Sequence, residues 1–469
     1  MTTDTRADQL IDVQALRIGM FVRLDGGWMA HPFPLSNFTI STPDQLATLR
    51  ALGVTQVRWD PRLSDIEPAG AAPSGTPPSA PFATPSVAPP STAGTQAALP
   101  VKTAAANPAA EAAAVASKPR PSLEELLGVD PSVAPAGEAE LQAQRLGRQR
   151  AALVHCERQF NEAASAYKQA TSVISSDPQD AKVQLEALSN NLLDKMLVEP
   201  DLCIRLLRDT AGGKAATHTL NVSILSMLLG RNFGLSDTDL LDLGVGALLH
   251  DIGKIDLPER LHYPDERFTP TELKAYQEHV VLGLARGQKM GLRASVMQVI
   301  AQHHEMADGS GFPLKLGSER MSDAARIVAM VNAYDTLCNP QLSTRAITPH
   351  EALATMFTHA KKRYDPALLR TFIKMMGVYP AGSTVQLTDD RYAVVVSVDS
   401  ARPLKPRVLM HDAKVARDAA LIVDLGDQPG LGIRRGVKPE QLPLPTLHYL
   451  APRQRVVYYF EPAYPADPA

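Results

Sequence analysis

The hydrophobic pattern of the second half of the chain has a helical period. Between positions 200 and 376, apolar residues recur three or four positions apart, as on one face of an α-helix. The pattern predicts helices over 216–230, 237–250, 271–284, 292–304 and 326–337. Two amphipathic helices are predicted before them, over 138–170 and from Asp177-Pro178 to about Leu197. The latter two could pair between subunits or pack on their own domain, so a homodimer stays open. We expect a mainly α protein.

Both ends of the chain alternate apolar and polar residues instead, which favours strands. Near the start, 20–24 and 55–59 alternate, and a helix is predicted between them from Ser41-Thr42-Pro43-Asp44 to a stop at Gly53. Positions 8–66 therefore predict a small α+β module. After position 379, short strands are predicted over 384–387, 392–398 and 407–410. We expect 379–469 to form a small β extension.

The segment 67–136 separates the first module from the helices. It consists mainly of Ala, Pro, Ser, Thr and Gly, which cannot bury enough apolar surface to offset the chain entropy of folding. We expect a disordered linker, followed by connecting helices over 137–199 and an all-helical domain over 200–378.

Charge and composition exclude some classes of partner. The 469-residue chain has a formal net charge of −3, which argues against whole-surface attraction to nucleic acid or to an anionic membrane. The most apolar runs are too short and too interrupted to span a bilayer, so we expect a soluble, cytoplasmic protein. The three cysteines are far apart, which indicates neither a disulfide framework nor a zinc ribbon.

Histidines are concentrated in the helical span. His250 and Asp251 are adjacent at the end of an apolar run, and Gly253 and Lys254 follow. Alone, such a pair is more often a solvated helix end. Four further imidazoles in the predicted helices change that balance, namely His218, His279 and the adjacent pair His303-His304. An imidazole-rich ligand set favours iron, manganese or another transition metal over magnesium.

The ordered combination of these residues with Asp308-Gly309-Ser310-Gly311-Phe312-Pro313 resembles the HD-GYP family of cyclic di-GMP phosphodiesterases, over roughly 200–378. The first module is similar to the domain of unknown function that often precedes HD-GYP domains, on Arg17-Ile18-Gly19-Met20-Phe21-Val22 and Leu52-Gly53-Val54. The resemblance implies an all-helical, metal-dependent phosphohydrolase domain in bacterial second-messenger signalling. Its expected reaction opens cyclic di-GMP to linear pGpG, with further hydrolysis to GMP left open.

The resemblance also implies the roles of individual residues. His218, His250 and Asp251 would hold one metal ion, and Asp251 would bridge to a second ion held by His279, His303 and His304. Asp251 and Lys254 would be catalytic, with Lys254 neutralising a phosphate oxygen. Further substrate contacts would come from Lys254, Gly309, Gly311, Phe312 and Arg345. The glycine-rich loop or the N-terminal module would contact a signalling partner.

Several positions depart from the family pattern. An aspartate that completes the first metal's shell aligns with Asn332, whose amide can ligate only without charge. Lys214 replaces the glutamate that gives some members a third metal, so two ions are expected. Phe312 replaces the tyrosine of the family name, and Arg345 is the one matched cation of a basic element. A catalytically degenerate domain that binds cyclic di-GMP or a protein therefore remains the alternative, and another cyclic dinucleotide or a phosphomonoester remains a possible substrate.

Overall fold

The computed structural model describes residues 9–24, 37–51, 54–64, 136–199, 201–208, 213–264, 266–340, 342 and 345–463. Almost all of the predicted linker, and the predicted helix stop at Gly53, lie outside these residues.

The N-terminal module is a four-stranded antiparallel sheet with one helix. Its elements are β1 (Gln9–Asp12), β2 (Phe21–Arg23), β3 (Asn37–Thr39), α1 (Pro43–Ala51) and β4 (Gln56–Asp60). The strand order is β1-β4-β2-β3, and Val22, Leu49 and Trp59 belong to its own core. The predicted helix and two of the strands are confirmed, whereas β1 and β3 were not predicted.

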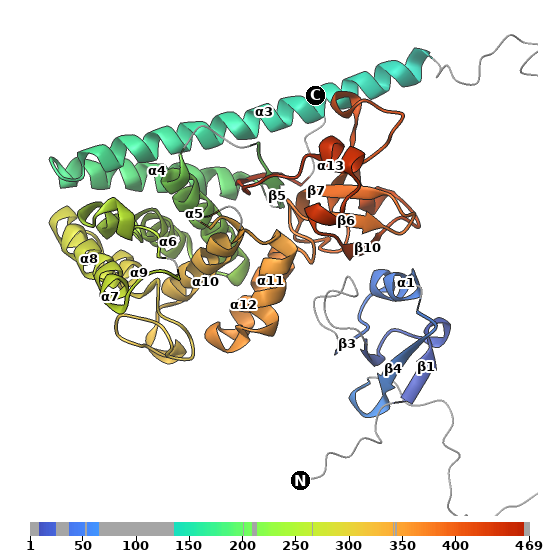
Figure 1. The fold of residues 1–469 in the computed structure, drawn as a ribbon, viewed down its shortest axis with the longest axis horizontal. Helices are drawn as coiled ribbons and strands as arrows, with labels where there is room; N and C mark the ends of the chain where they lie inside the picture. Colours follow the sequence, from blue (N-terminus) through green and yellow to red (C-terminus); the bar gives the residue numbers. More distant parts are fainter. Residues whose placement is uncertain are drawn as a thin grey trace, which may run out of the picture. The chain divides into compact units, whose positions relative to one another are not determined.

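Helices dominate the rest of the chain, which confirms the mainly α class. They are α3 (Ala136–Val173), α4 (Pro178–Val198), α5 (Lys214–Phe233), α6 (Asp237–Leu249), α7 (Pro270–Gln277), α8 (His279–Met290), α9 (Ala294–Gln302), α10 (Asp323–Cys338), α11 (Pro349–Thr358), α12 (Pro366–Met376) and α13 (Leu444–Leu450). Helices α5, α6, α9 and α10 pack against one another around the apolar centre (Figure 1).

Local signals explain where several helices begin. The Asp177 carboxylate accepts a hydrogen bond from the Asp180 amide and Pro178 opens α4, as predicted. Thr269 and Glu272 form a capping box at the start of α7. The helix predicted over 271–284 is wrong in one respect, because it is interrupted at Glu278 and His279 opens a new helix.

A seven-stranded sheet is built mainly from the C-terminal part of the chain, but it includes one strand, β5, that lies between α4 and α5. Its strands are β5 (Leu202–Leu206), β6 (Thr384–Leu387), β7 (Tyr392–Asp399), β8 (Arg407–Met410), β9 (Ile422–Asp424), β10 (Ile433–Gly436) and β11 (Tyr458–Pro462). The order is β10-β6-β7-β5-β11, with β8 paired to β7 and β9 paired to β8. The prediction that 200–376 is entirely helical is therefore wrong at β5. Four of the five β5 residues are buried, so the strand lacks the alternation that would have revealed it.

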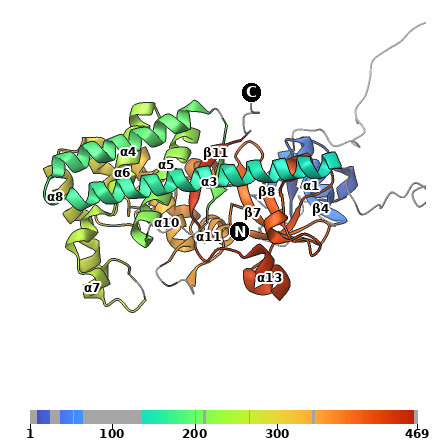
Figure 2. The ribbon, with the colours of Figure 1, turned by 90° about the horizontal axis from the view of Figure 1, so that it is seen from above.

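Helix α3 runs along both the helical part and the sheet (Figures 1 and 2). The Gln149 side chain exchanges two hydrogen bonds with the Ile422 backbone, and the Tyr459 hydroxyl donates to Gln159 Oε1. Helix α3 therefore packs on its own chain, which is one of the two alternatives that the sequence left open. Within the described residues, no helix combines the length and the apolar character that crossing a membrane requires.

Candidate metal centre and its cavity

Ends of four helices bring the predicted ligands together. His218 lies in the second turn of α5, His250-Asp251 follows α6, His279 opens α8, and His303-His304 follows α9. Two groups of potential ligand atoms result. One consists of His218, His250 and Asp251, and the other of Asp251, His279, His303 and His304.

The Asp251 carboxylate lies between these two groups. Its Oδ2 is 3.8 Å from His218 Nε2 and 3.4 Å from His250 Nε2. Its Oδ1 is 3.6 Å from His279 Nε2 and 3.7 Å from His303 Nε2. These gaps are long for hydrogen bonds, but two ligands that each lie about 2.1 Å from one tetrahedral ion are about 3.4 Å apart. Each carboxylate oxygen thus faces a different set of imidazoles, as a bridging ligand requires.

The tautomers of three imidazoles leave their Nε2 lone pairs facing this carboxylate. Nδ1 of His250, His279 and His303 donates to the carbonyl oxygen three residues earlier, at 2.7, 2.6 and 2.8 Å respectively. A neutral ring carries one proton, so Nε2 has none. Nε2 of His279 and Nε2 of His303 nevertheless lie 3.2 Å apart, and His250 Nε2 and Asp251 Oδ1 are buried without a hydrogen-bond partner. Buried acceptors without donors fit a cation between them.

Burial and charge keep these ligands in the protonation states that metals need. Burial lowers the pKa of His279 to about 3 and also lowers the pKa of His303 and His304. Burial of Asp251 would raise its pKa, but the Lys254 ammonium and the surrounding imidazoles together hold it well below its usual value. The His279, His303 and His304 imidazoles are therefore neutral and the Asp251 carboxylate is ionised near neutral pH.

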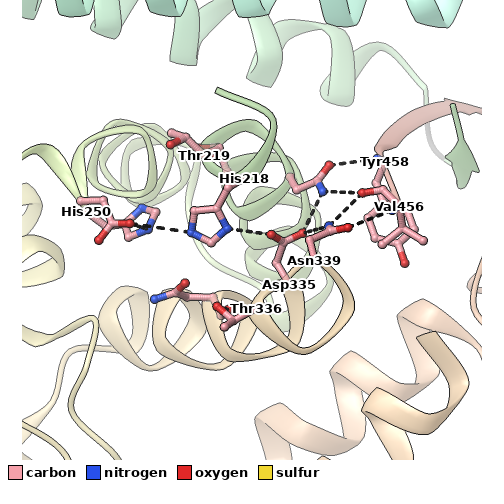
Figure 3. Close-up of polar contacts among 12 residues, drawn as sticks. His218, Thr219, His250, Asp335, Thr336, Asn339, Val456 and Tyr458 are labelled. Atoms are coloured by element: carbon pink, nitrogen blue, oxygen red, sulfur yellow. Dashed lines mark hydrogen bonds and ion pairs between the residues drawn. The ribbon is translucent and has the colours of Figure 1, made fainter. Parts of the chain in front are cut away.

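His218 is oriented from behind by a carboxylate that the sequence did not reveal. Asp335 Oδ2 accepts from His218 Nδ1 at 2.7 Å, while its Oδ1 accepts from the Asn221 and Asn339 amides at 2.8 and 2.9 Å (Figure 3). A carboxylate in this position fixes the ring of a metal ligand and raises its basicity. Asp335 is fully buried on α10, three residues after Asn332.

A cavity of about 500 Å³ adjoins the ligands. Lys254 lines it, with its Nζ 2.6 Å from Asp251 Oδ2 and above the rings of Tyr263 and Tyr276. The described residues that line it include four cations, Lys214, Lys254, Arg363 and Arg455, and no aspartate or glutamate. Such a lining suits an anionic ligand.

Asn332 lines the same cavity as His218 and Lys254 and is buried. The amide that replaces the family's aspartate therefore faces the cavity that adjoins the candidate metal centre. Lys214, where some family members have a glutamate, lines this cavity too.

The glycine-rich loop contributes to the cavity through its aromatic residue. Phe312 lines the cavity and stacks on the His304 ring at 4.5 Å between centroids. Gly309 has φ +73°, and a Cβ at Gly311 would lie 2.4 Å from the His304 carbonyl oxygen. Both glycines thus shape the loop itself, and neither is among the residues that line the cavity. Their predicted contact with substrate stays a prediction.

Arg345 does not line this cavity. It lines a neighbouring one with Tyr263 and Pro264, and its Nη2 lies 3.2 Å from Glu266 Oε2. The site residues that sequence reasoning missed include Tyr276, whose hydroxyl lies 3.1 Å from His304 Nε2, and Arg455, which lies far from every motif. Glu305 follows the histidine pair directly, and its buried carboxylate accepts from the Leu314 and Leu316 backbone amides.

Comparisons with known proteins match two parts of the chain. Residues 201–368 match the family described as HD domain, and residues 9–182 match the domain of unknown function DUF3391. A cyclic di-GMP phosphodiesterase of Pseudomonas aeruginosa is 28% identical over 406 residues, which cover 85% of this chain and 84% of that protein.

Other relatives match a smaller share of the chain. The response regulator RpfG of Xanthomonas campestris, a cyclic di-GMP phosphodiesterase, is 30% identical over 34% of this chain and 43% of its own length. A 3'3'-cGAMP-specific phosphodiesterase of Vibrio cholerae is 26% identical over 37% of each chain. The chain spans less than half the length of these two relatives. Among solved structures, an HD-GYP-like protein of Bdellovibrio bacteriovorus aligns over 44% of this chain and 68% of its own, with 21% identity and a TM-score of 0.37.

Residues 201–368 are thus similar to an HD domain and residues 9–182 to DUF3391, in line with the resemblance to HD-GYP proteins found in the sequence.

Proposed function

We propose that this protein is a metal-dependent phosphodiesterase that hydrolyses cyclic di-GMP to linear pGpG, with further hydrolysis to GMP left open. One observation carries the proposal: the Nε2 atoms of four imidazoles face the two oxygens of one carboxylate, beside a lysine and a cation-lined cavity. Relatives named as cyclic di-GMP phosphodiesterases support the choice of substrate.

Two divalent ions fit the two ligand groups. His218, His250 and Asp251 would hold one, and Asp251, His279, His303 and His304 the other. Imidazole-rich shells suit iron or manganese better than magnesium. When bound, such ions supply an activated nucleophile and stabilise negative charge on phosphate oxygens.

The chain's own residues bind and orient the substrate around this centre. Lys254 is held by Asp251 at the cavity wall, where its ammonium can neutralise charge on a phosphate oxygen. The rings of Tyr263, Tyr276 and Phe312 also line the cavity and can pack against a base or ribose.

Asn332 favours a second candidate, a degenerate HD-GYP domain that binds a cyclic dinucleotide or a protein. Its neutral amide stands where the family has a carboxylate, so the first ion would be held more weakly. The Vibrio relative named for 3'3'-cGAMP also keeps another cyclic dinucleotide open as the substrate.

A manganese titration separates these candidates. Wild type and Asn332→Asp are assayed for cyclic di-GMP hydrolysis across the titration, beside a direct binding measurement and elemental analysis of bound metal. We expect slow wild-type turnover that excess manganese rescues, with close to two ions per chain. Asn332→Asp should reach full turnover at lower manganese, because it restores a charged ligand.

Background turnover in every sample would reject the proposal that the protein is an enzyme. Cyclic di-GMP binding without turnover would then support the degenerate binding domain. Parallel reactions with 3'3'-cGAMP identify the preferred base. An absence of bound metal at any manganese concentration would reject the binuclear centre itself.

A further inference from the structure

The metal cavity receives one side chain from outside the HD domain. The matched domain ends at position 368, whereas Arg455 lies just before β11, the last strand of the seven-stranded sheet. Arg455 nevertheless lines the cavity together with Lys254 and Asn332.

The backbone beside Arg455 is fixed to the helices that carry the ligands (Figure 3). The Val456 amide donates to Asn339 Oδ1 at 2.9 Å, and the Val456 carbonyl accepts from Asn221 and Asn339, both at 2.9 Å. The Tyr458 amide donates to Asn221 Oδ1 at 3.0 Å. The same two asparagines hold the Asp335 carboxylate that orients His218. The backbone next to Arg455 and the carboxylate that orients His218 are therefore held by the same two side chains.

Nearby arginines have carboxylate partners, whereas Arg455 has none in the described part of the chain. Arg205 lies 3.2 Å from Glu461, and Arg208 lies 2.6 Å from Glu157. Arg455 makes no hydrogen bond or ion pair with the described residues, although it is half-buried. An arginine in a cavity without carboxylates presents five donors to an anion.

A cyclic dinucleotide has two phosphodiester groups, and one metal centre can act on only one of them at a time. Lys254 stands beside the metal ligands, so the second phosphate needs another cation. Arg345, the cation expected from sequence, lies in a different cavity and is paired with Glu266.

We propose that Arg455 binds the phosphate of the cyclic dinucleotide that is not being cleaved, and so makes the C-terminal segment part of the substrate site. The inference rests on the proposed function, because it takes a diester with two phosphates as the ligand. Asn221 and Asn339 act as positioning residues for this segment.

The test compares wild type with Arg455→Ala and Arg455→Lys in the full-length, manganese-loaded protein. Arg453→Ala is the matched control, because Arg453 lies two residues earlier and lines a separate cavity. For Arg455→Ala we expect KM and Kd for cyclic di-GMP to rise about 10- to 100-fold, since a charged hydrogen bond is lost. Metal content and the rate on bis(p-nitrophenyl) phosphate, which has a single phosphate, should not change.

Arg455→Lys should give an intermediate KM, because it keeps the charge but loses the planar fork. If Arg455→Ala does not fold, the KM and Kd of Arg455→Lys alone test the proposal. An unchanged KM in both variants, with active wild type, would overturn the role of Arg455 and leave the phosphodiesterase standing. If wild type binds cyclic di-GMP without hydrolysing it, weaker binding by both Arg455 variants supports the inference while the proposed enzyme fails. Equal cyclic di-GMP binding by wild type and both Arg455 variants would overturn the proposed role of Arg455.

Discussion

Lys254 helps to keep the buried Asp251 carboxylate ionised, as metal binding requires. Its ammonium is 2.6 Å from Asp251 Oδ2 and opposes the effect of burial on the Asp251 pKa. The same ammonium lies above the Tyr263 and Tyr276 rings and faces the cavity. An incoming phosphate would therefore meet a cation that the fold already holds in place.

We expect Lys254→Ala to lower the turnover number by roughly 10²–10³, because a preorganised charge on the developing transition state is lost. Steady-state kinetics on cyclic di-GMP at saturating manganese measures this. Lys289→Ala, at an exposed position near the end of α8, is the control and should behave as wild type. An unchanged rate in Lys254→Ala would limit Lys254 to a structural ion pair with Asp251.

The cluster of histidines and Asp251 could be predicted from sequence because these residues are chemically distinctive and lie at or near helix ends. Their convergence in two groups around Asp251 follows the predicted division. Asp335 and Arg455 could not be predicted in the same way, since carboxylates and arginines are common and their roles depend on contacts between distant segments. The substrate contact expected of Arg345 stays a prediction, and the motif did not indicate that its side chain lines a neighbouring cavity.

At the scale of elements, Gly253 sets how closely the turn after Asp251 approaches α8. A Cβ at Gly253 would lie 1.9 Å from the His279 carbonyl oxygen and 2.4 Å from the Gly283 amide nitrogen. Both are backbone atoms and cannot rotate away. The His250-Asp251 pair and His279 therefore keep their separation only with glycine at this position.

We expect Gly253→Ala to displace α8, reduce bound metal from about two ions per chain to one or fewer, and destabilise the fold by at least about 1–3 kcal/mol. Elemental analysis and chemical denaturation measure the two effects. Gly147→Ala is the matched control, because Gly147 is exposed on α3 with no atom within 4 Å of a new Cβ. It should be neutral or slightly stabilising, since alanine favours helix. Full metal content in Gly253→Ala would show that α8 is not positioned by this contact.

The elements themselves were predictable to different degrees. Helices with a cap and a proline, such as α4 and α7, began close to where local signals placed them. The break at Glu278 was missed because its backbone keeps a helical conformation, with φ −62° and ψ −20°. Strand β5 was missed because its partners, β7 and β11, come from far later in the chain.

For the molecule as a whole, β5 is the strand that joins the HD helices to the C-terminal sheet. It precedes α5 and lies between β7 and β11, so the sheet cannot be completed without the end of the chain. Arg205 on β5 and Glu461 on β11 form an ion pair with only 4% and 7% of their side chains exposed. The Ser397 hydroxyl on β7 and Arg407 on β8 also donate to Glu461, so side chains from four neighbouring strands meet at this carboxylate.

We expect Glu461→Ala to lower the free energy of unfolding by about 3–5 kcal/mol, because it leaves the Arg205 guanidinium buried without its counter-charge. Denaturation should be followed by far-UV circular dichroism, since both tryptophans, Trp28 and Trp59, precede the helices and report on other parts of the chain. Glu162→Ala is the control, because its pair with Arg158 is about two-thirds exposed and should contribute less than about 1 kcal/mol. The helices and the sheet share one apolar core, so the loss should appear as a shift of a single helical transition. A helical transition at its wild-type position in Glu461→Ala would mean that the HD helices are stable without the sheet, and Arg455 would then be held in the metal cavity by the asparagine contacts alone.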